Sequence, residues 1–319
     1  MKQKVFTIGI FVSTLFVTTP AFCQKLKPVT LGMTGKSIAT VPFEMSTKKG
    51  HFRNEGLDVK SITIRQSDII IRAILTNELN FMSIIPTAIL ASVRGLPIRT
   101  IAVNMESAPY VLVGRPQIKS MSELKGKKVA TSSIGGMSSY VVREIVARNG
   151  LDPDRDLALL AVGGSEARTA ALMAGFVDAA LVVAPFNYNL ERQGYTRLVW
   201  GPDFVRYPLN GVAASADFLA NNRDFVVAFL RGVAGGVREV KQRRSEMIAF
   251  IKEYLDLPEE EAVKSYEFLV SNMPDNLVTD DAIIRKAMEF AGHALQLKPE
   301  AVPDISKVRD WSFARAVKW

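Results

Sequence analysis

Apolar and polar positions alternate in a repeating order through the first two thirds of the chain. Short apolar runs such as 57–64 alternate like strands, and each is followed by a longer segment, such as 68–77, whose apolar residues recur at helical spacing. A repeated order of strand and helix predicts parallel sheets that are covered by helices on both faces. The predicted strands are 27–33, 57–64, 81–85, 97–103, 110–114, 127–131, 157–162, 176–183, 196–200 and 210–215.

Helices are predicted between these strands and through the last third of the chain. Pro42 and Pro86 stand where a helix tolerates proline, at its first position, and Asp68 is predicted to cap the helix that follows it. The predicted helices are 42–49, 68–77, 86–95, 136–149, 166–174 and 185–193, and 221–288 is mostly helical. Because the strand at 210–215 is expected to return to the first group, we predict two hinged lobes: 24–110 plus 211–319 (lobe I) and 111–210 (lobe II).

The first 23 residues have the layout of a secretory signal peptide. Lys2 and Lys4 precede an uncharged apolar run at 5–21, and small residues follow near a cleavage site. A run of about 17 residues is at the lower limit for a membrane span, so we prefer cleavage to an uncleaved anchor. The third interpretation is a lipoprotein acylated at Cys23, against which the bulky Phe22 argues.

Composition narrows the class of protein. The chain has 319 residues, of which 48% are hydrophobic and 23% charged, as in soluble globular proteins. Cys23 is the only cysteine, so loss of the signal peptide leaves no thiol for disulfides, catalysis or metal binding. The formal net charge of +8 is compatible with anionic ligands.

Motifs for catalysis, metals and nucleic acids are not found in the sequence. His51 and His293 each lack a second ligand at metal spacing, and there is no nucleophile elbow, Walker A loop or dinucleotide fingerprint. The basic run at 238–244 lies among apolar residues at helical spacing, which predicts the solvated face of one long helix. We therefore predict no catalytic residue, metal, cofactor or nucleic-acid partner.

Five segments of the chain resemble, in order, the motifs of one protein family. They are KKGHFRNEGLDV (48–59), ILTNELNF (74–81), RGLPI (94–98), LKGKKVA (124–130) and AALMAGFVDAA (170–180). The family is that of periplasmic solute-binding proteins of ABC importers that serve sulfonates, nitrate, taurine and thiamine-precursor pyrimidines. The chain departs from the family pattern at 65–67, where Arg-Gln-Ser replaces a loop of small residues and argues against the standard small oxyanions.

The resemblance implies an α/β fold of the type II periplasmic-binding-protein class. In that fold each lobe is a mostly parallel sheet flanked by helices, here with a helical C-terminal extension. The resemblance also implies a periplasmic monomer that captures a small molecule between its lobes and delivers it to an inner-membrane ABC permease. Two alternatives stay open: an enzyme of thiamine-precursor or menaquinone type with this fold, and the ligand-binding partner of a membrane sensor.

Candidate ligand contacts follow from the strand order. Ligands of open α/β sheets bind outside the carboxyl ends of the strands, and in two lobes these ends face each other across a cleft. The strongest candidate is 132–139, where glycines permit close approach and a helix N-terminus with serine hydroxyls suits an anion; the alternative is a turn whose serines only cap the helix. The predicted contacts are Thr34, Ser37, Phe43, Arg65, Gln66, Ser67, Thr87 and Asn104 in lobe I, and Ser133, Gly135, Gly136, Met137, Ser138, Pro185 and Phe186 in lobe II.

The predicted ligand is a small organic anion that resembles a sulfonate or a carboxylate. Arg65 is its expected charge partner, because a guanidinium can hold an oxyanion through two hydrogen bonds; the alternative is a solvent-facing strand end. Arg168 is expected to point outward from its helix. An apolar wall around the organic body is expected from Phe43, Met105, Met137 and Phe186.

Overall fold

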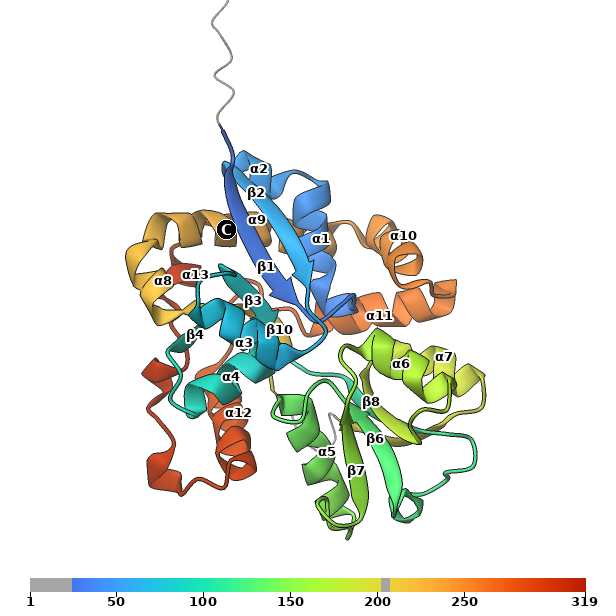
Figure 1. Ribbon diagram of the computed structural model, residues 1–319. Coiled ribbons are helices and arrows are strands. Elements are labelled where there is room, and N and C mark those ends of the chain that lie inside the picture. The colour runs from blue at the N-terminus through green and yellow to red at the C-terminus, as the bar shows by residue number, and fades with distance from the viewer. Residues whose placement is uncertain (1–24, 202–206) are drawn as a thin grey trace, which may run out of the picture.

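The computed structural model describes residues 25–201 and 207–319, which form two five-stranded sheets (Figure 1). The predicted signal peptide, with Cys23, lies outside the described residues. The first sheet has the order β2-β1-β3-β10-β4 and the second has the order β7-β6-β8-β5-β9. The strands are β1 (Lys27–Met33), β2 (Leu57–Thr63), β3 (Phe81–Ile84), β4 (Ile98–Met105), β5 (Tyr110–Gly114), β6 (Lys127–Thr131), β7 (Leu157–Ala161), β8 (Ala179–Val183), β9 (Thr196–Trp200) and β10 (Asn210–Ser215).

In each sheet one strand runs against the others. β1 is parallel to β2 and β3, whereas β10 is antiparallel to β3 and β4. Likewise β6 is parallel to β7 and β8, whereas β5 is antiparallel to β8 and β9. The reversed strand is in both cases the one that enters from the other sheet. The predicted two-lobe α/β fold with mostly parallel sheets is therefore confirmed.

We call the first sheet with its helices lobe I and the second sheet with its helices lobe II. β5 begins at Tyr110 and β10 at Asn210, one residue before the predicted boundaries; the division of the chain into these domains stays a prediction. The helices up to lobe II are α1 (Val41–Lys48), α2 (His51–Asn54), α3 (Ser67–Leu75), α4 (Ile85–Val93), α5 (Met137–Arg148), α6 (Ser165–Met173) and α7 (Phe186–Arg192), with 3₁₀ turns Ile38–Thr40 and Met121–Leu124.

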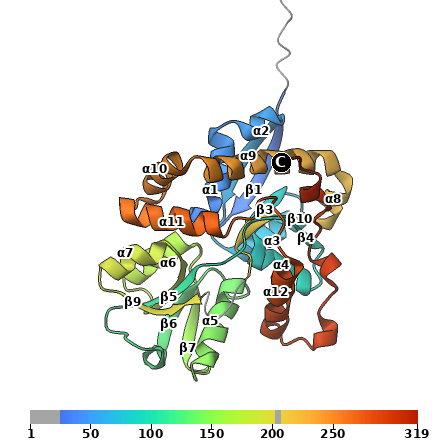
Figure 2. The same cartoon turned by 180° about the vertical axis from the view of Figure 1, so that it is seen from behind.

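The last third of the chain forms the predicted helical extension. Figures 1 and 2 show that these helices gather around lobe I, while α11 also lies beside α6 and α7 of lobe II. The helices are α8 (Ala216–Asn221), α9 (Arg223–Gln242), α10 (Arg244–Leu255), α11 (Glu259–Ser271), α12 (Asp281–Ala294) and α13 (Ser312–Arg315), with 3₁₀ turns Pro299–Ala301 and Ile305–Lys307.

Two local predictions are wrong. Asp68 does not cap α3: the helix begins one residue earlier, at Ser67, and the Asp68 carboxylate lies in its first turn, where the helix dipole favours a negative charge. The basic run at 238–244 is not one helix face, because α9 ends at Gln242 and α10 starts at Arg244.

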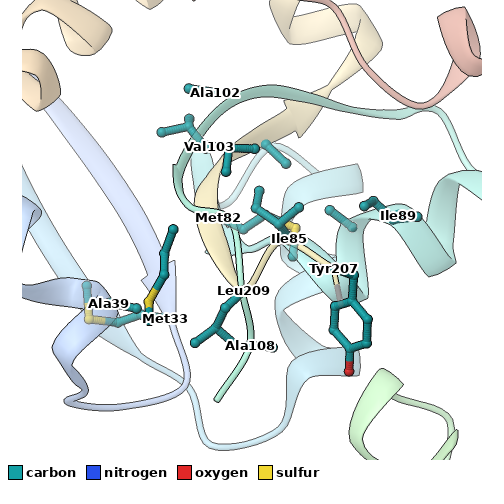
Figure 3. Close-up of a cluster of buried hydrophobic side chains, with 14 of the residues drawn as sticks. Met33, Ala39, Met82, Ile85, Ile89, Ala102, Val103, Ala108, Tyr207 and Leu209 are labelled. Atoms are coloured by element: carbon teal, nitrogen blue, oxygen red, sulfur yellow. The ribbon is translucent and has the colours of Figure 1, made fainter. Parts of the chain in front are cut away.

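The main hydrophobic core fills lobe I and continues into lobe II. The Phe229 ring of α9 stacks on Phe52 of α2 and on Phe81 of β3, with ring centroids 5.2 Å and 4.1 Å apart. Figure 3 shows another part of this core, where Met33 at the end of β1 and Leu209 before β10 are buried. These two residues connect the core to the cavity described next.

Candidate functional site

A small cavity lies between the lobes, at the carboxyl ends of the parallel strands. Its volume is about 60 Å³, and we call it the interlobe cavity. Both lobes line it, as expected for a ligand site in this fold. The lining residues are Met33, Thr34, Gly35, Lys36, Ser37, Thr40, Ser67, Ser83, Ile84, Thr87, Leu209 and Asn210 from lobe I, and Tyr110, Ser132, Ser138, Ser165, Arg168 and Val183 from lobe II.

Arg168 is the buried cation of the interlobe cavity. Its side chain belongs to α6 and only 4% of the residue is exposed. Nη2 donates to Ser165 Oγ at 3.0 Å, while Nε and Nη1 have no hydrogen-bond partner among the described residues. Burial lowers the pKa of Arg168 from its ordinary value to about 10, although nearby Tyr110 opposes the shift. The guanidinium is thus still charged at neutral pH, with two free donors.

The other polar groups of the cavity are uncharged, apart from Lys36 at its exposed rim. Ser83 Oγ and Asn210 Oδ1 are buried without a partner among the described residues. Burial raises the pKa of Tyr110, with Arg168 and Tyr207 opposing, so its phenol stays protonated as a donor. No aspartate or glutamate lines the cavity in the described part of the chain. This combination of donors without carboxylates favours an anion.

Four helices begin at the interlobe cavity. Ser67, Thr87, Ser138 and Ser165 line it from the first turns of α3, α4, α5 and α6. The N-terminus of a helix carries free N–H groups and a partial positive charge. The backbone therefore adds to the field of Arg168, and it does so from both lobes.

The lobes touch each other around the cavity. Ser67 Oγ of lobe I lies 3.1 Å from Ser133 Oγ of lobe II. At the edge of the cleft, Arg94 Nη2 donates to the Tyr140 hydroxyl of lobe II at 2.8 Å. Gly164 of lobe II lies so close to lobe I that a Cβ there would overlap the Thr34 carbonyl oxygen. The cleft is therefore closed in this structure.

The structure brings together part of the predicted site. Five predicted residues line the cavity, namely Thr34, Ser37, Ser67, Thr87 and Ser138. Ser133 is buried beside them through its contact with Ser67, and Gly136 packs against both hydroxyls, with a Cβ position 2.8 Å from Ser67 Oγ.

The remaining predicted residues lie elsewhere. Phe43 and Met137 are buried in the hydrophobic core, and Asn104 Nδ2 donates to the Ala39 carbonyl at 2.9 Å. Gln66 is half-buried at the start of α3, and Gly135 is exposed. Pro185 and Phe186 line a neighbouring pocket.

The expected position of Arg168 is wrong, and Arg65 does not line the cavity. Arg65 is exposed, whereas Arg168 points inward. The signal for Arg168 was present in the sequence: Leu172, four residues later on the same helical face, is fully buried. Tyr110 and Asn210 were not predicted. They begin the reversed strands β5 and β10, where the chain enters each sheet from the other lobe, whereas the prediction considered the loops that follow strands.

The described residues contain no group of three or more His, Cys, Asp or Glu that could hold a metal ion. Across 25–201 and 207–319, no helix combines the length and hydropathy that a membrane crossing requires.

Several known proteins are similar to this chain in sequence or in fold. YtlA of Bacillus subtilis (strain 168), whose name describes it as a binding protein, is 23% identical over 269 residues, which cover 81% of this chain and 80% of YtlA. Two solved structures are similar in fold. The alkanesulfonate-binding protein SsuA from Xanthomonas axonopodis pv. citri, bound to MOPS, has a TM-score of 0.70 and 16% identity over 89% of this chain and 98% of SsuA. The periplasmic nitrate-binding protein NrtA from Synechocystis PCC 6803 has a TM-score of 0.70 and 16% identity over 91% of this chain and 88% of NrtA.

The fold also occurs in an enzyme. The desulfurization enzyme DSZB has a TM-score of 0.60 and 13% identity over 90% of this chain and 97% of its own. Similarity at this level shows the fold alone, so the family must come from the sequence. The model of the NMT1/THI5-like family matches residues 38–246, more than half of the chain, and the protein therefore belongs to the NMT1/THI5-like family.

Proposed function

We propose that the protein is the periplasmic solute-binding component of an ABC transporter. It captures a small anion in the interlobe cavity and delivers it to an inner-membrane permease. The observation that carries the proposal is the buried guanidinium of Arg168, with Nε and Nη1 unpartnered among the described residues. A buried cation without a partner is costly, and an anion that accepts from both nitrogens removes that cost.

The arrangement of the site supports capture by closure. A ligand shifts an open–closed equilibrium only as far as it binds the closed state more tightly. An anion on Arg168 of lobe II lies within a lining that includes Ser37, Ser83 and Thr87 of lobe I. The open state separates these groups, so the anion binds the closed state better.

The size of the cavity favours a head group of a few atoms. Its volume of about 60 Å³ is well below the ~150 Å³ of a cavity that admits benzene. Three of the four residues expected to form an apolar wall, Phe43, Met105 and Met137, are buried in the core and do not line it. We therefore infer a carboxylate, sulfonate or nitrate-like head whose organic part, if present, is short or extends out of the cavity.

Relatives and the predicted signal peptide support the location and the partner. SsuA and NrtA are named for the anions they bind, and NrtA is named as periplasmic. The layout of residues 1–23 is that of an exported protein. We propose a periplasmic monomer with two domains, one at 24–110 plus 211–319 and the other at 111–210.

A thermal-shift series on the purified mature protein tests the proposal. The ligands are formate, acetate, nitrate and methanesulfonate, with acetamide as the neutral counterpart of acetate. A bound anion raises the melting temperature through RT ln(1 + [L]/Kd), and acetamide does not. The anion must also be recovered unchanged by mass spectrometry. Stabilisation by acetamide alone contradicts the anion site, and conversion of the ligand indicates the enzyme alternative.

A further inference from the structure

Two cations, one from each lobe, line the interlobe cavity. Arg168 of lobe II is buried, and Lys36 of lobe I stands at the exposed rim, on the loop that follows β1. No aspartate or glutamate belongs to the lining in the described part of the chain, so the formal charge of the lining is +2. A singly charged ligand on Arg168 therefore neutralises only half of this charge.

The ammonium group of Lys36 is held only weakly at its present position. Lys36 forms no salt bridge within 25–201 and 207–319. Its Nζ lies 5.0 Å from the centroid of the Tyr254 ring, and the Tyr254 hydroxyl lies 3.2 Å from Oγ1 of Thr40, which itself lines the cavity. The contact of an exposed ammonium with a tyrosine ring is weak, and a lysine stem of four carbons is flexible. The ammonium can therefore turn from the ring toward an anion in the cavity.

The carboxylates around Lys36 lie outside the lining of the cavity. Burial raises the pKa of the Glu44 carboxyl in α1, and the charge of nearby Lys36 opposes this shift. Glu166, Glu253 and Asp256 line the neighbouring pocket together with Lys36, and all three are exposed. Salt and water screen the attraction between exposed charges more than that between partly buried ones. A negative charge inside the cavity therefore competes well for the lysine.

We propose that the interlobe cavity selects a compact dianion, whose two charges are shared between Arg168 of lobe II and Lys36 of lobe I. This inference rests on the proposed function and deepens it, because it assigns the class of solute: an anion of a few atoms with two negative charges, such as a phosphonate. Without a ligand, the like charges of the two lobes repel each other and oppose closure. A dianion between them turns this repulsion into attraction, so it closes the cleft more strongly than a monoanion does.

Calorimetric titration with methylphosphonate and methanesulfonate tests the inference. Both ions carry a methyl group and three oxygens on one tetrahedral atom, but at about pH 8.5 the phosphonate has a second negative charge, because its second proton leaves near neutral pH as in a phosphate monoester. We expect methylphosphonate to bind at least tenfold more tightly there. At about pH 5.5 it carries one charge, and the ratio should fall to within about threefold of one. Methanesulfonate stays singly charged and corrects for protein groups, such as Glu44, that titrate in between.

Substitutions of Lys36 test its share in the preference. Lys36→Met removes one cation, and by Coulomb's law a dianion then loses about twice the free energy that a monoanion loses. Both affinities should fall, that for methylphosphonate further, so that the ratio decreases several-fold. Lys36→Arg keeps the charge and should keep the preference. The control Lys60→Met changes an exposed lysine of β2 outside the lining and should leave both affinities unchanged.

The outcomes separate the two proposals. If methanesulfonate binds and methylphosphonate binds no more tightly at about pH 8.5, or if Lys36→Met keeps the full preference, the dianion inference is wrong while the anion site stands. If neither these ions nor the small anions bind, both proposals fail.

Discussion

Two strand-to-helix turns hold equivalent places in the two lobes but differ in what they bury. β2 and β7 occupy the same position in their sheets, and each leads into a helix that starts with serine, Ser67 in α3 and Ser165 in α6. Three residues after the serine, lobe I has Ile70, which is fully buried in the core, and lobe II has Arg168. At the same position of the turn, lobe I therefore has a core residue that stabilises the fold. Lobe II has an unpaired charge, whose burial destabilises the protein unless a ligand is bound.

The largest expected effect comes from making lobe II resemble lobe I. Arg168→Met removes the charge and leaves a shorter, unbranched apolar side chain, so anion affinity should fall at least 100-fold, about 3 kcal/mol. The ligand-free protein should become more stable by about 1–4 kcal/mol, because an uncompensated buried charge is replaced by an apolar side chain. Urea unfolding with and without the anion measures both effects. A variant that is less stable without ligand would contradict the claim that the buried, unpaired charge of Arg168 destabilises the ligand-free protein.

The second largest loss of anion affinity is expected from a substitution that keeps the two lobes apart. Gly164→Ala places a Cβ against the Thr34 carbonyl oxygen across the cleft, while the backbone of Gly164 itself suits alanine, with φ −63°. We expect at least tenfold weaker anion binding and a more open shape in small-angle X-ray scattering with the anion present.

The matched control is Gly135→Ala. Gly135 is exposed at the other cleft loop, and a Cβ there meets nothing closer than 3.9 Å. It should bind and close as the wild type does. Equal closure by the Gly164 variant would show that the turns need not approach this closely.

The pH dependence separates the role of Arg168 from that of other groups. With a pKa of about 10, Arg168 is charged at neutral pH, so anion affinity should be flat below about pH 9 and fall as the pH rises through 10. The free energy of unfolding of the ligand-free protein should change in the opposite direction and rise with pH. At and above pH 10 the unfolded chain, in which Arg168 has its higher ordinary pKa, binds more protons at this site than the folded protein, so the penalty is relieved as the pH rises.

Arg168→Met serves as the reference for this measurement, because lysines and tyrosines also titrate above pH 9. The difference between wild type and variant should carry the transition near pH 10. A difference in stability that does not change over this range would contradict the assignment.

The smallest effect concerns the contact between the lobes. Ser67→Ala removes the hydroxyl that lies 3.1 Å from Ser133 Oγ and that also lines the cavity. A hydrogen bond of this kind contributes about 1 kcal/mol, so affinity should fall about fivefold. Ser271→Ala, on the exposed face of α11, is the control for calorimetry. A fall as large as that for Arg168→Met would mean that the hydroxyl, not the charge, dominates.

The fold could be predicted from the sequence because its signals are local. Strand alternation, prolines at helix starts and the ordered motifs fixed the elements to within a few residues. The part of the site that first-turn serines such as Ser67 and Ser138 form could also be predicted, because ligands of open α/β sheets bind at the carboxyl ends of the strands, where helices begin. The charge could not be found this way, because burial of Arg168 depends on how α6 packs at the cleft. Its strand-end position favoured Arg65 in the sequence, and the helical spacing of Arg168 and Leu172 was the signal that pointed the other way.

The most direct test is calorimetric titration of Arg168→Met and Arg65→Ala side by side, with the anion that stabilises the wild type most. Arg168 is buried in the interlobe cavity and Arg65 is exposed outside it. We predict that Arg168→Met shows no measurable heat of binding and that Arg65→Ala binds within about twofold of the wild type, as surface changes usually do. Retained binding by Arg168→Met, with loss of binding by Arg65→Ala, would contradict the proposal that the buried guanidinium of lobe II holds the anion.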